Sequence, residues 1–200
     1  MLRNIWLLFF CLSAGEGYGQ YSWKVEKDKD GIKIYSSEIA NASFKAVKVE
    51  CTFPGTFQKL ASILTNVTQY PDWVYNTKKT QILRQNDFSD IVYYTETSFP
   101  WPFSNRDAVI HLQVRTDTVS KVMMIAGSNE SSLVPEFFGK VRIPHYSANW
   151  VVTSPSPGTI KINYTIEADP GGNIPSWLAN MFIDKGPYET FKKLGEKLTN

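Results

Sequence analysis

The sequence is poor in the residues that carry most enzyme chemistry, with two cysteines and two histidines among 200 residues. Cys11 lies in an expected leader, so Cys51 has no internal disulfide partner and is interpreted as an inert buried thiol. His111 and His145 stand apart, and no spacing of His, Cys, Asp and Glu matches a zinc site. The sequence also lacks a phosphate-binding glycine loop and a Gly-x-Ser-x-Gly motif. We therefore predict no catalytic residues, no metal and no cofactor.

An excess of charge of one sign is missing as well. The chain has 21 Lys and Arg against 19 Asp and Glu, which gives a net charge of +2. No stripe of basic residues dominates any segment, so the sequence has no electrostatic footprint for nucleic acid.

Long hydrophobic runs are confined to the N-terminus. Residues 5–12 are apolar but too few to span a bilayer as a helix. Gly17 and Gly19 stand at the −3 and −1 positions of a cut before Gln20, the pattern of a secretory signal peptide. We expect a signal peptide over residues 1–19, a single domain over 20–200, and a secreted or periplasmic protein. A buried N-terminal strand or an anchor is the alternative reading.

Alternation of apolar and polar residues dominates the rest of the chain. Ala108, Ile110 and Leu112 share one side of a predicted strand, and Ile162 and Tyr164 share one side of another. Strands with one apolar face predict an antiparallel sheet covered on a single side. We expect nine strands, over residues 23–26, 32–37, 44–53, 80–84, 90–99, 106–117, 121–128, 146–154 and 159–167.

Two helices are predicted. Residues 56–67 place Leu60 and Leu64 on one buried face. A long helix is expected from about residue 174 to the C-terminus, with a kink at Gly186-Pro187. The predicted fold is therefore α+β, a curved antiparallel sheet around a long C-terminal helix.

Periodicity alone does not distinguish a packed core from a cavity between this sheet and helix. If a cavity exists, the inward positions of the strands and of the final helix line it. Glu96 is a candidate polar group in that lining, with a solvated position as the alternative. The candidate lining residues are Tyr93, Glu96, Ala108, Ile110, Leu112, Ile162, Tyr164, Trp177, Met181 and Phe182.

A stiff aromatic loop interrupts the sheet at Phe99-Pro-Trp-Pro-Phe-Ser-Asn105. Two prolines prevent either neighbouring strand from running through it. Trp101 and Phe103 are large apolar residues on this loop, and we interpret them as a gate or a membrane contact, with local packing as the alternative. The adjacent Arg106 and Asp107 are interpreted as a structural ion pair or a loop clamp.

Four segments resemble the START domain, a lipid-transfer module of the helix-grip, or Bet v 1-like, superfamily. They are Trp23 with Asp30-Gly-Ile-Lys-Ile-Tyr35, then Tyr70-Pro-Asp-Trp73, then Pro100-Trp-Pro-Phe-Ser-Asn-Arg-Asp107, and Ala168-Asp-Pro-Gly-Gly-Asn-Ile-Pro-Ser-Trp177. The third and fourth of these segments are the more specific ones. Together the four segments cover nearly the whole chain after the leader.

The resemblance implies a helix-grip fold with an internal hydrophobic tunnel that holds one lipid, such as a sterol or a phospholipid. It implies transfer between membranes without chemistry, through a gate formed by the aromatic loop and the C-terminal helix. The expected partners are a lipid and, transiently, a membrane surface, and the protein is expected to be a monomer.

The chain departs from sterol-binding members, which bury an acid–arginine pair in the tunnel. The corresponding positions here are Tyr93 and Leu112. Two other functions stay open. A cyclase-like or hydrolytic enzyme of the same superfamily would need an inward Glu96 with a raised pKa, and a cavity-free interaction module would have a solid core.

Overall fold

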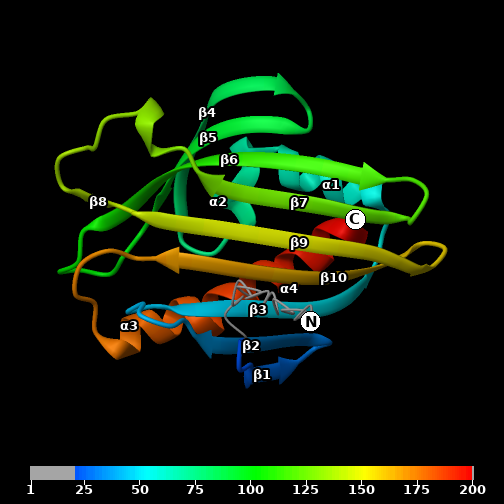
Figure 1. Cartoon of the computed structure of the whole chain (residues 1–200), viewed down its shortest axis with the longest axis horizontal. Coiled ribbons are helices and arrows are strands. Elements are labelled where there is room, and N and C mark those ends of the chain that lie inside the picture. Colours follow the sequence, from blue (N-terminus) through cyan, green and yellow to red (C-terminus); the bar gives the residue numbers. More distant parts are fainter. Residues whose placement is uncertain (1–20, 200) are drawn as a thin grey trace, which may run out of the picture.

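The computed structural model describes residues 21–199, so the expected signal peptide lies outside the described residues. These residues form a single sheet with a helical C-terminal segment along one face (Figure 1). The predicted fold class, a curved antiparallel sheet with a long C-terminal helix, is confirmed. The strands are β1 (Lys24–Lys29), β2 (Ile32–Glu38), β3 (Lys45–Pro54), β4 (Thr77–Asp87), β5 (Asp90–Thr97), β6 (Asn105–Asp117), β7 (Val122–Asn129), β8 (Lys140–Arg142), β9 (His145–Ser156) and β10 (Thr159–Asp169).

The strand order is β1-β2-β3-β10-β9-β7-β6-β5-β4, with antiparallel pairing throughout this path. The last strand, β10, therefore joins the three N-terminal strands to the rest of the sheet. The short β8 was not predicted. It pairs in parallel with residues Asn105–Asp107 of β6, beyond the point where the β7 pairing ends at Ile110.

The N-terminal helices close one side of the concave face. In α1 (Phe57–Thr65), the side chain of Thr56 caps the helix by accepting a hydrogen bond from the Lys59 amide at 3.1 Å. A 3-10 turn and the short α2 (Tyr70–Trp73) follow, and both end residues of α2 are buried. The tight spacing of Tyr70-Pro-Asp-Trp73 thus brings two aromatic rings into the interior.

The C-terminal helical segment has three parts, α3 (Ser176–Asn180), a π-helical turn (Met181–Lys185) and α4 (Gly186–Thr199). The Gly186 amide donates to the Met181 carbonyl, five residues back. Pro187 has no amide hydrogen, so it cannot continue the ordinary α-helical ladder at this point. The irregularity predicted at Gly186-Pro187 is present and takes the form of this π-turn.

The inner face of the sheet packs against α1, α2 and α4. A β-carbon on Gly195 of α4 would lie 2.8 Å from the Phe53 ring, so glycine allows the helix to approach β3 closely. The buried core includes Ile32, Ile34, Val49, Leu60, Ile91, Tyr93, Ala108, Ile110, Leu112, Met123, Ile125, Val152, Ile160, Ile162, Phe191 and Leu194.

A second, smaller apolar cluster lies on the outer face of β5 and β6. It consists of Val92, Tyr94 and Val109, with Leu83 and Val134 packed against it. Val134 belongs to the segment 130–139 between β7 and β8, which covers this part of the outer face. Both faces of β5 are therefore buried over Ile91–Tyr94.

Candidate functional site

Burial along the inner face changes from one end of the sheet to the other. Near the β9–β10 turn, Val152 and Ile160 are fully buried. Further along the same strands, toward the aromatic loop, Tyr146, Tyr164 and Ile166 are only half-buried although they point the same way. The inward side chains that keep accessible surface thus gather toward the loop end of the molecule.

The C-terminal helix contacts the sheet directly near the middle of the inner face. The Phe191 ring of α4 stacks on Trp150 of β9, with ring centroids 5.2 Å apart, and lies 5.4 Å from Tyr164 of β10. Trp150 and Tyr164 are themselves 4.5 Å apart. This aromatic contact joins α4 to β9 and β10.

Four tyrosines from different elements face this interior: Tyr70 of α2, Tyr93 of β5, Tyr146 of β9 and Tyr164 of β10. Desolvation is the main cause that raises the pKa of each one, to about 12 for Tyr146 and well above the ordinary value for Tyr93 and Tyr164. Coulombic interactions with one another also raise the pKa values of Tyr70, Tyr93 and Tyr164. All four hydroxyls therefore stay protonated at physiological pH and lie in one neighbourhood.

These hydroxyls, called the inner tyrosine set below, differ in their partners. Tyr70 donates to the Leu64 carbonyl at 2.5 Å. The Tyr93 hydroxyl interacts with that of Tyr70, and the Tyr164 hydroxyl with that of Tyr146. Among residues 21–199, no backbone carbonyl or carboxylate accepts a hydrogen bond from Tyr93, Tyr146 or Tyr164.

The aromatic loop lies against the start of the C-terminal helical segment at the same end of the molecule (Figure 1). Phe99 stacks on Phe182 of the π-turn, with ring centroids 4.7 Å apart. Phe103 meets Trp177 edge to face at 6.3 Å. Trp101, at the tip, is 92% exposed. The loop thus contacts the helix through two aromatic pairs and presents a third ring to solvent.

Arg106 acts as the clamp of this loop. Its guanidinium donates to the carbonyls of Ser104 at 2.5 Å, Pro170 at 2.9 Å and Gly171 at 3.0 Å, and it lies 4.2 Å from the centre of the Phe99 ring. It therefore ties the loop to the turn that follows β10.

The predicted ion pair between Arg106 and Asp107 is not formed, because neighbours in a strand point to opposite faces. Asp107 instead pairs with Arg142 of β8 on the outer face, through contacts of 2.9 and 3.1 Å. Both side chains are almost fully buried. Arg142 also donates to the Val134 and Pro135 carbonyls, which fixes the covering segment 130–139.

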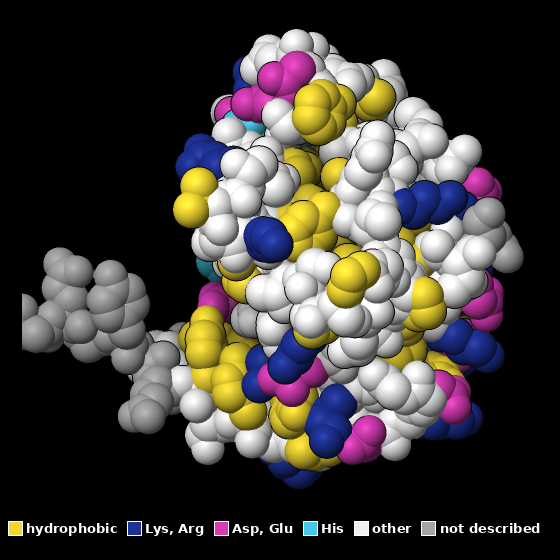
Figure 2. Space-filling view, turned by 90° about the vertical axis from the view of Figure 1, so that its right-hand side faces the viewer, with side chains coloured by type: hydrophobic (Ala, Val, Ile, Leu, Met, Phe, Trp, Pro, Cys, Tyr) yellow, Lys and Arg dark blue, Asp and Glu magenta, His cyan; other side chains and the backbone are white. Residues whose placement is uncertain are grey.

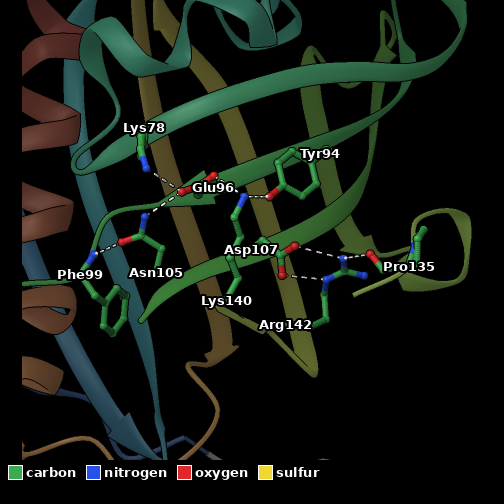
Figure 3. Close-up of polar contacts among 9 residues, drawn as sticks. All are labelled: Lys78, Tyr94, Glu96, Phe99, Asn105, Asp107, Pro135, Lys140 and Arg142. Atoms are coloured by element: carbon green, nitrogen blue, oxygen red, sulfur yellow. Dashed lines mark hydrogen bonds and ion pairs between the residues drawn. The ribbon is translucent and has the colours of Figure 1, made fainter. Parts of the chain in front are cut away.

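Glu96 is the centre of a second polar network on the outer face (Figure 3). It accepts from Lys140 at 2.5 Å, Asn105 at 2.7 Å and Lys78 at 3.1 Å. Lys140 also donates to the Tyr94 hydroxyl at 2.9 Å. Desolvation acts to raise the pKa of Glu96, but these hydrogen bonds outweigh it and lower the pKa to about 2.

The prediction that Glu96 lines the interior is therefore wrong. Tyr93 belongs to the inner core, whereas Tyr94 and Glu96 share the opposite face of β5 and both contact Lys140. Asn105 links this network to the aromatic loop, because its side-chain oxygen accepts from the Phe99 amide at 3.1 Å. The outer network holds the base of the loop and leaves Glu96 ionised.

The other predicted lining residues fall into two groups. The first group is buried in the inner core and consists of Tyr93, Ala108, Ile110, Leu112 and Ile162. Tyr164 is partly buried and packs against this group. Met181 and Phe182 are half-buried in the π-turn, while Trp177 is 53% exposed and faces Phe103 rather than the core.

Sequence reasoning missed Tyr70, Tyr146 and Trp150 as interior aromatic residues. Tyr146 and Trp150 alternate with polar residues in phase with the buried Ala148 and Val152, so the alternation of that strand contained the information. For Tyr70, the pattern Tyr-Pro-Asp-Trp indicated a helical turn but not which way its rings point.

Two surface pockets lie away from this interior. One, of about 240 Å³, is on the outer face between β4, β5 and the covering segment, and is lined in part by Leu83, Tyr94 and Phe137. The other, of about 390 Å³, lies beside α2 and α4 and is mostly polar. Neither includes a predicted lining residue.

The remaining candidates for chemistry have structural surroundings. Burial raises the pKa of the Cys51 thiol to about 12, which suppresses its reactivity. His111 and His145 each contact one carboxylate, Asp90 and Glu167. Within residues 21–199, no group of three or more His, Cys, Asp and Glu is placed to hold a metal, and no helix is both long and apolar enough to cross a bilayer.

The end opposite the aromatic loop carries the turns between β4 and β5, β6 and β7, and β9 and β10. Figure 2 shows acidic and basic side chains interspersed on this face, with scattered hydrophobic ones between them. Phe88, at the β4–β5 turn, is 69% exposed. Phe88 is therefore an exposed aromatic residue at the opposite end of the molecule, with which those of the loop can be compared.

Comparison with known proteins identifies the fold and its relatives. A family model described as the START domain matches residues 17–200. The phosphatidylcholine transfer protein of Mus musculus is 28% identical over 171 residues, which cover 82% of this chain and 78% of that protein. An uncharacterised protein of Pseudomonas aeruginosa is 29% identical over 172 residues, covering 86% of this chain and 84% of the other.

Solved structures agree. A STAR-related lipid transfer protein from Xanthomonas axonopodis superimposes with a TM-score of 0.79 at 28% identity, covering 89% of this chain and 99% of that one. Human StAR-related lipid transfer protein 5 reaches a TM-score of 0.76 at 16% identity, with 88% of this chain and 86% of that one covered. The second likeness supports the fold alone.

Proposed function

The chain belongs to the START domain family, and from this membership we propose that it binds one lipid between the sheet and the C-terminal helix and carries it between membranes unchanged. Lipid binding and transfer in general are supported by the family and by its relatives. The internal site and the carrying step are the parts that the proposal adds.

The observation that carries the proposal is the state of Tyr146 and Tyr164. Both side chains keep accessible surface, yet desolvation raises the pKa of each. We infer that these inward-pointing side chains border the space that a lipid would occupy. Ile166, on the same strand as Tyr164, is half-buried as well, which supports an enclosed space next to the aromatic loop.

An apolar space of this kind favours acyl chains. Each buried methylene group is worth about 0.8 kcal/mol relative to water, so a lipid gains much of its binding energy from its chains. The Phe99–Phe182 pair joins the aromatic loop to the π-turn, and the Phe103–Trp177 pair joins it to α3. We infer that separation of these two pairs opens the site, and that Trp101 enters the membrane interface when it does.

The outward position of Glu96 weighs against the cyclase-like or hydrolytic alternative. That alternative required an inward carboxyl with a raised pKa, whereas Glu96 faces outward and its pKa is lowered to about 2. We retain transfer without chemistry as the proposed function, for a protein secreted or exported to the periplasm and acting as a monomer.

Transfer of a fluorescent phospholipid between two vesicle populations tests the gate. Trp101→Ala with Phe103→Ala is expected to slow transfer about tenfold or more, because the exposed Trp101 ring and the Phe103 contact with Trp177 are both lost. Phe88→Ala is the matched control, since it removes an exposed ring from the opposite end, and it should leave the rate unchanged. Equal slowing by both variants, or by neither, would remove the gate role.

A further inference from the structure

A polar pocket outside the interior lies beside α2 and α4, and the proposed function does not use it. Its volume is about 390 Å³, within the range of ~300–1,000 Å³ that is common for ligand pockets. Residues 74–77, which join α2 to β4, contribute to one wall, and the end of the π-turn and the first half of α4 contribute to the other. We call it the lysine pocket, and its lining includes Tyr75, Asn76, Thr77, Lys185, Glu189 and Lys193.

The two lysines of this pocket are free to bind an anion. Lys185, Glu189 and Lys193 are spaced four residues apart and line the same pocket, yet among residues 21–199 neither ammonium group forms an ion pair with a carboxylate. Lys193 donates to the Asp72 carbonyl at 3.2 Å, and the Lys185 ammonium lies 5.9 Å from the centre of the Tyr75 ring. Because an ammonium group has three donors, both lysines can donate to a further acceptor.

The charge of the lysine pocket matches that of a phosphodiester. Two lysines against one glutamate leave one positive charge in excess, and a phosphodiester carries one negative charge. The side chains of Asn76 and Thr77 supply uncharged donors for its remaining oxygens. A zwitterionic phospholipid brings an ammonium group of its own and leaves the excess charge unbalanced. The pocket therefore favours an anionic phospholipid over a zwitterionic one.

Both walls of the lysine pocket are connected to the proposed gate. The Asn76 carbonyl accepts a hydrogen bond from the amide of Ser98 at 2.8 Å, and Ser98 directly precedes the aromatic loop. On the other wall, Lys185 is the last residue of the π-turn, whose Phe182 stacks on Phe99 of that loop. A group bound in the pocket thus contacts the elements that hold each half of the gate.

We propose that the lysine pocket binds the phosphate group of an anionic phospholipid of the membrane surface, and that this bound headgroup positions the gate for exchange. The inference rests on the proposed function for the membrane contact. The site is nevertheless separate from that of the transported lipid, since it lies on the outside of α2 and α4 and includes none of the predicted lining residues.

Flotation with vesicles tests the site. The vesicles consist of dioleoylphosphatidylcholine alone or of an equal mixture with dioleoylphosphatidylglycerol, and the partition coefficient of the protein is measured for each. We expect the unaltered protein to bind the mixed vesicles about tenfold more strongly, since each lysine near an anionic membrane surface contributes roughly fivefold. Equal binding to both kinds of vesicle would overturn the inference.

Neutral variants locate the effect. Lys185→Gln with Lys193→Gln is expected to lower binding to the mixed vesicles about tenfold. Lys192→Gln with Lys197→Gln is the matched control, because it removes two charges from the same helix outside the pocket, and it should change binding less than about twofold. Equal losses in the two double variants would mean diffuse attraction to the membrane and would overturn the site.

Glu189→Gln should act in the opposite direction. It removes the negative charge of the pocket and is expected to raise binding to the mixed vesicles about twofold to fivefold. Glu196→Gln, on the same helix outside the pocket, is its control and should have little effect. A Glu189 variant that binds no better than its control would contradict the assignment.

Two further measurements separate the alternatives. Inorganic phosphate has the same chemistry as the headgroup, but at constant ionic strength we expect millimolar phosphate to leave the protein on the mixed vesicles. Displacement by phosphate would assign the pocket to the free ion and overturn the lipid part of the inference. Lipid transfer between vesicles of phosphatidylcholine alone should change less than about twofold in the Lys185 and Lys193 double variant. Absence of transfer by the unaltered protein would instead contradict the proposed function.

Discussion

Tyr93 and Tyr94 are neighbours in β5, yet their hydroxyls lie in polar environments of opposite kinds. Tyr94 accepts a hydrogen bond from Lys140 within the outer network, where every charge has a partner. Tyr93 faces the interior, where it interacts with the hydroxyl of Tyr70 and no charged group. The comparison separates a charged network on the outer face of β5 from an uncharged one on its inner face, and it assigns a structural role to the first.

The strongest test of the outer face is Asp107→Asn. It leaves the nearly buried guanidinium of Arg142 without its carboxylate, and removal of one partner from a buried pair costs about 3–5 kcal/mol. We expect that loss in the free energy of unfolding, measured by urea denaturation. Asp28→Asn, in an exposed pair with Lys33, is the control and should change little. A small effect at Asp107 would mean that the outer face does not hold the fold together.

Glu96→Gln tests the same face through pH. Because the folded-state pKa of Glu96 is lowered to about 2, its carboxylate stabilises the protein above about pH 4.5, and this contribution disappears as the pH falls toward 2. The variant should lose about 2–3 kcal/mol at neutral pH and show a flatter decline of stability between pH 4.5 and 2.

Glu38→Gln is the control for that measurement. Glu38 also pairs with a lysine, Lys45, but it is exposed. Its replacement should leave both the stability and its pH dependence close to those of the original protein. If the stability of the Glu96 variant declined between pH 4.5 and 2 as steeply as that of the original protein, Glu96 would not be held by its three donors.

The smallest expected losses of folding free energy concern the inner tyrosine set, where Tyr70 and Tyr146 are compared. Tyr70→Phe leaves the Leu64 carbonyl without its donor, which costs about 1–3 kcal/mol. Tyr146→Phe removes a hydroxyl without a carbonyl or carboxylate acceptor and should cost less than about 1 kcal/mol in the lipid-free protein. Urea denaturation of both variants measures the difference. The reverse order would mean that the Tyr146 hydroxyl contributes more to the stability of the fold than that of Tyr70.

The sequence was most informative where one face of a strand is buried. In β6 and β10 the alternation identified Ala108, Ile110, Leu112 and Ile162 as inward residues, and all four lie in the core. Each position there is decided by local periodicity, which the sequence contains directly.

The sequence failed where a strand is buried on both faces. Ile91–Tyr94 forms a continuous apolar run, so its periodicity does not tell which side is inside. The outer side is covered by segment 130–139 and by β8, whose three residues pair with a strand about 35 positions earlier. Such a distant contact has no local pattern, and it is the reason that Glu96 was placed on the wrong face and that Arg142 was missed as the partner of Asp107.

The central claim is that a lipid occupies the space between the half-buried inner face and the C-terminal helix. Native mass spectrometry of the protein purified from its own host tests it most directly, followed by organic extraction of whatever is bound. We predict a species heavier than the polypeptide by one lipid, which binds at a ratio of one to one and is lost on denaturation. A protein that shows only the mass of the bare chain, and stays bare after incubation with vesicles of host lipid, would contradict the account.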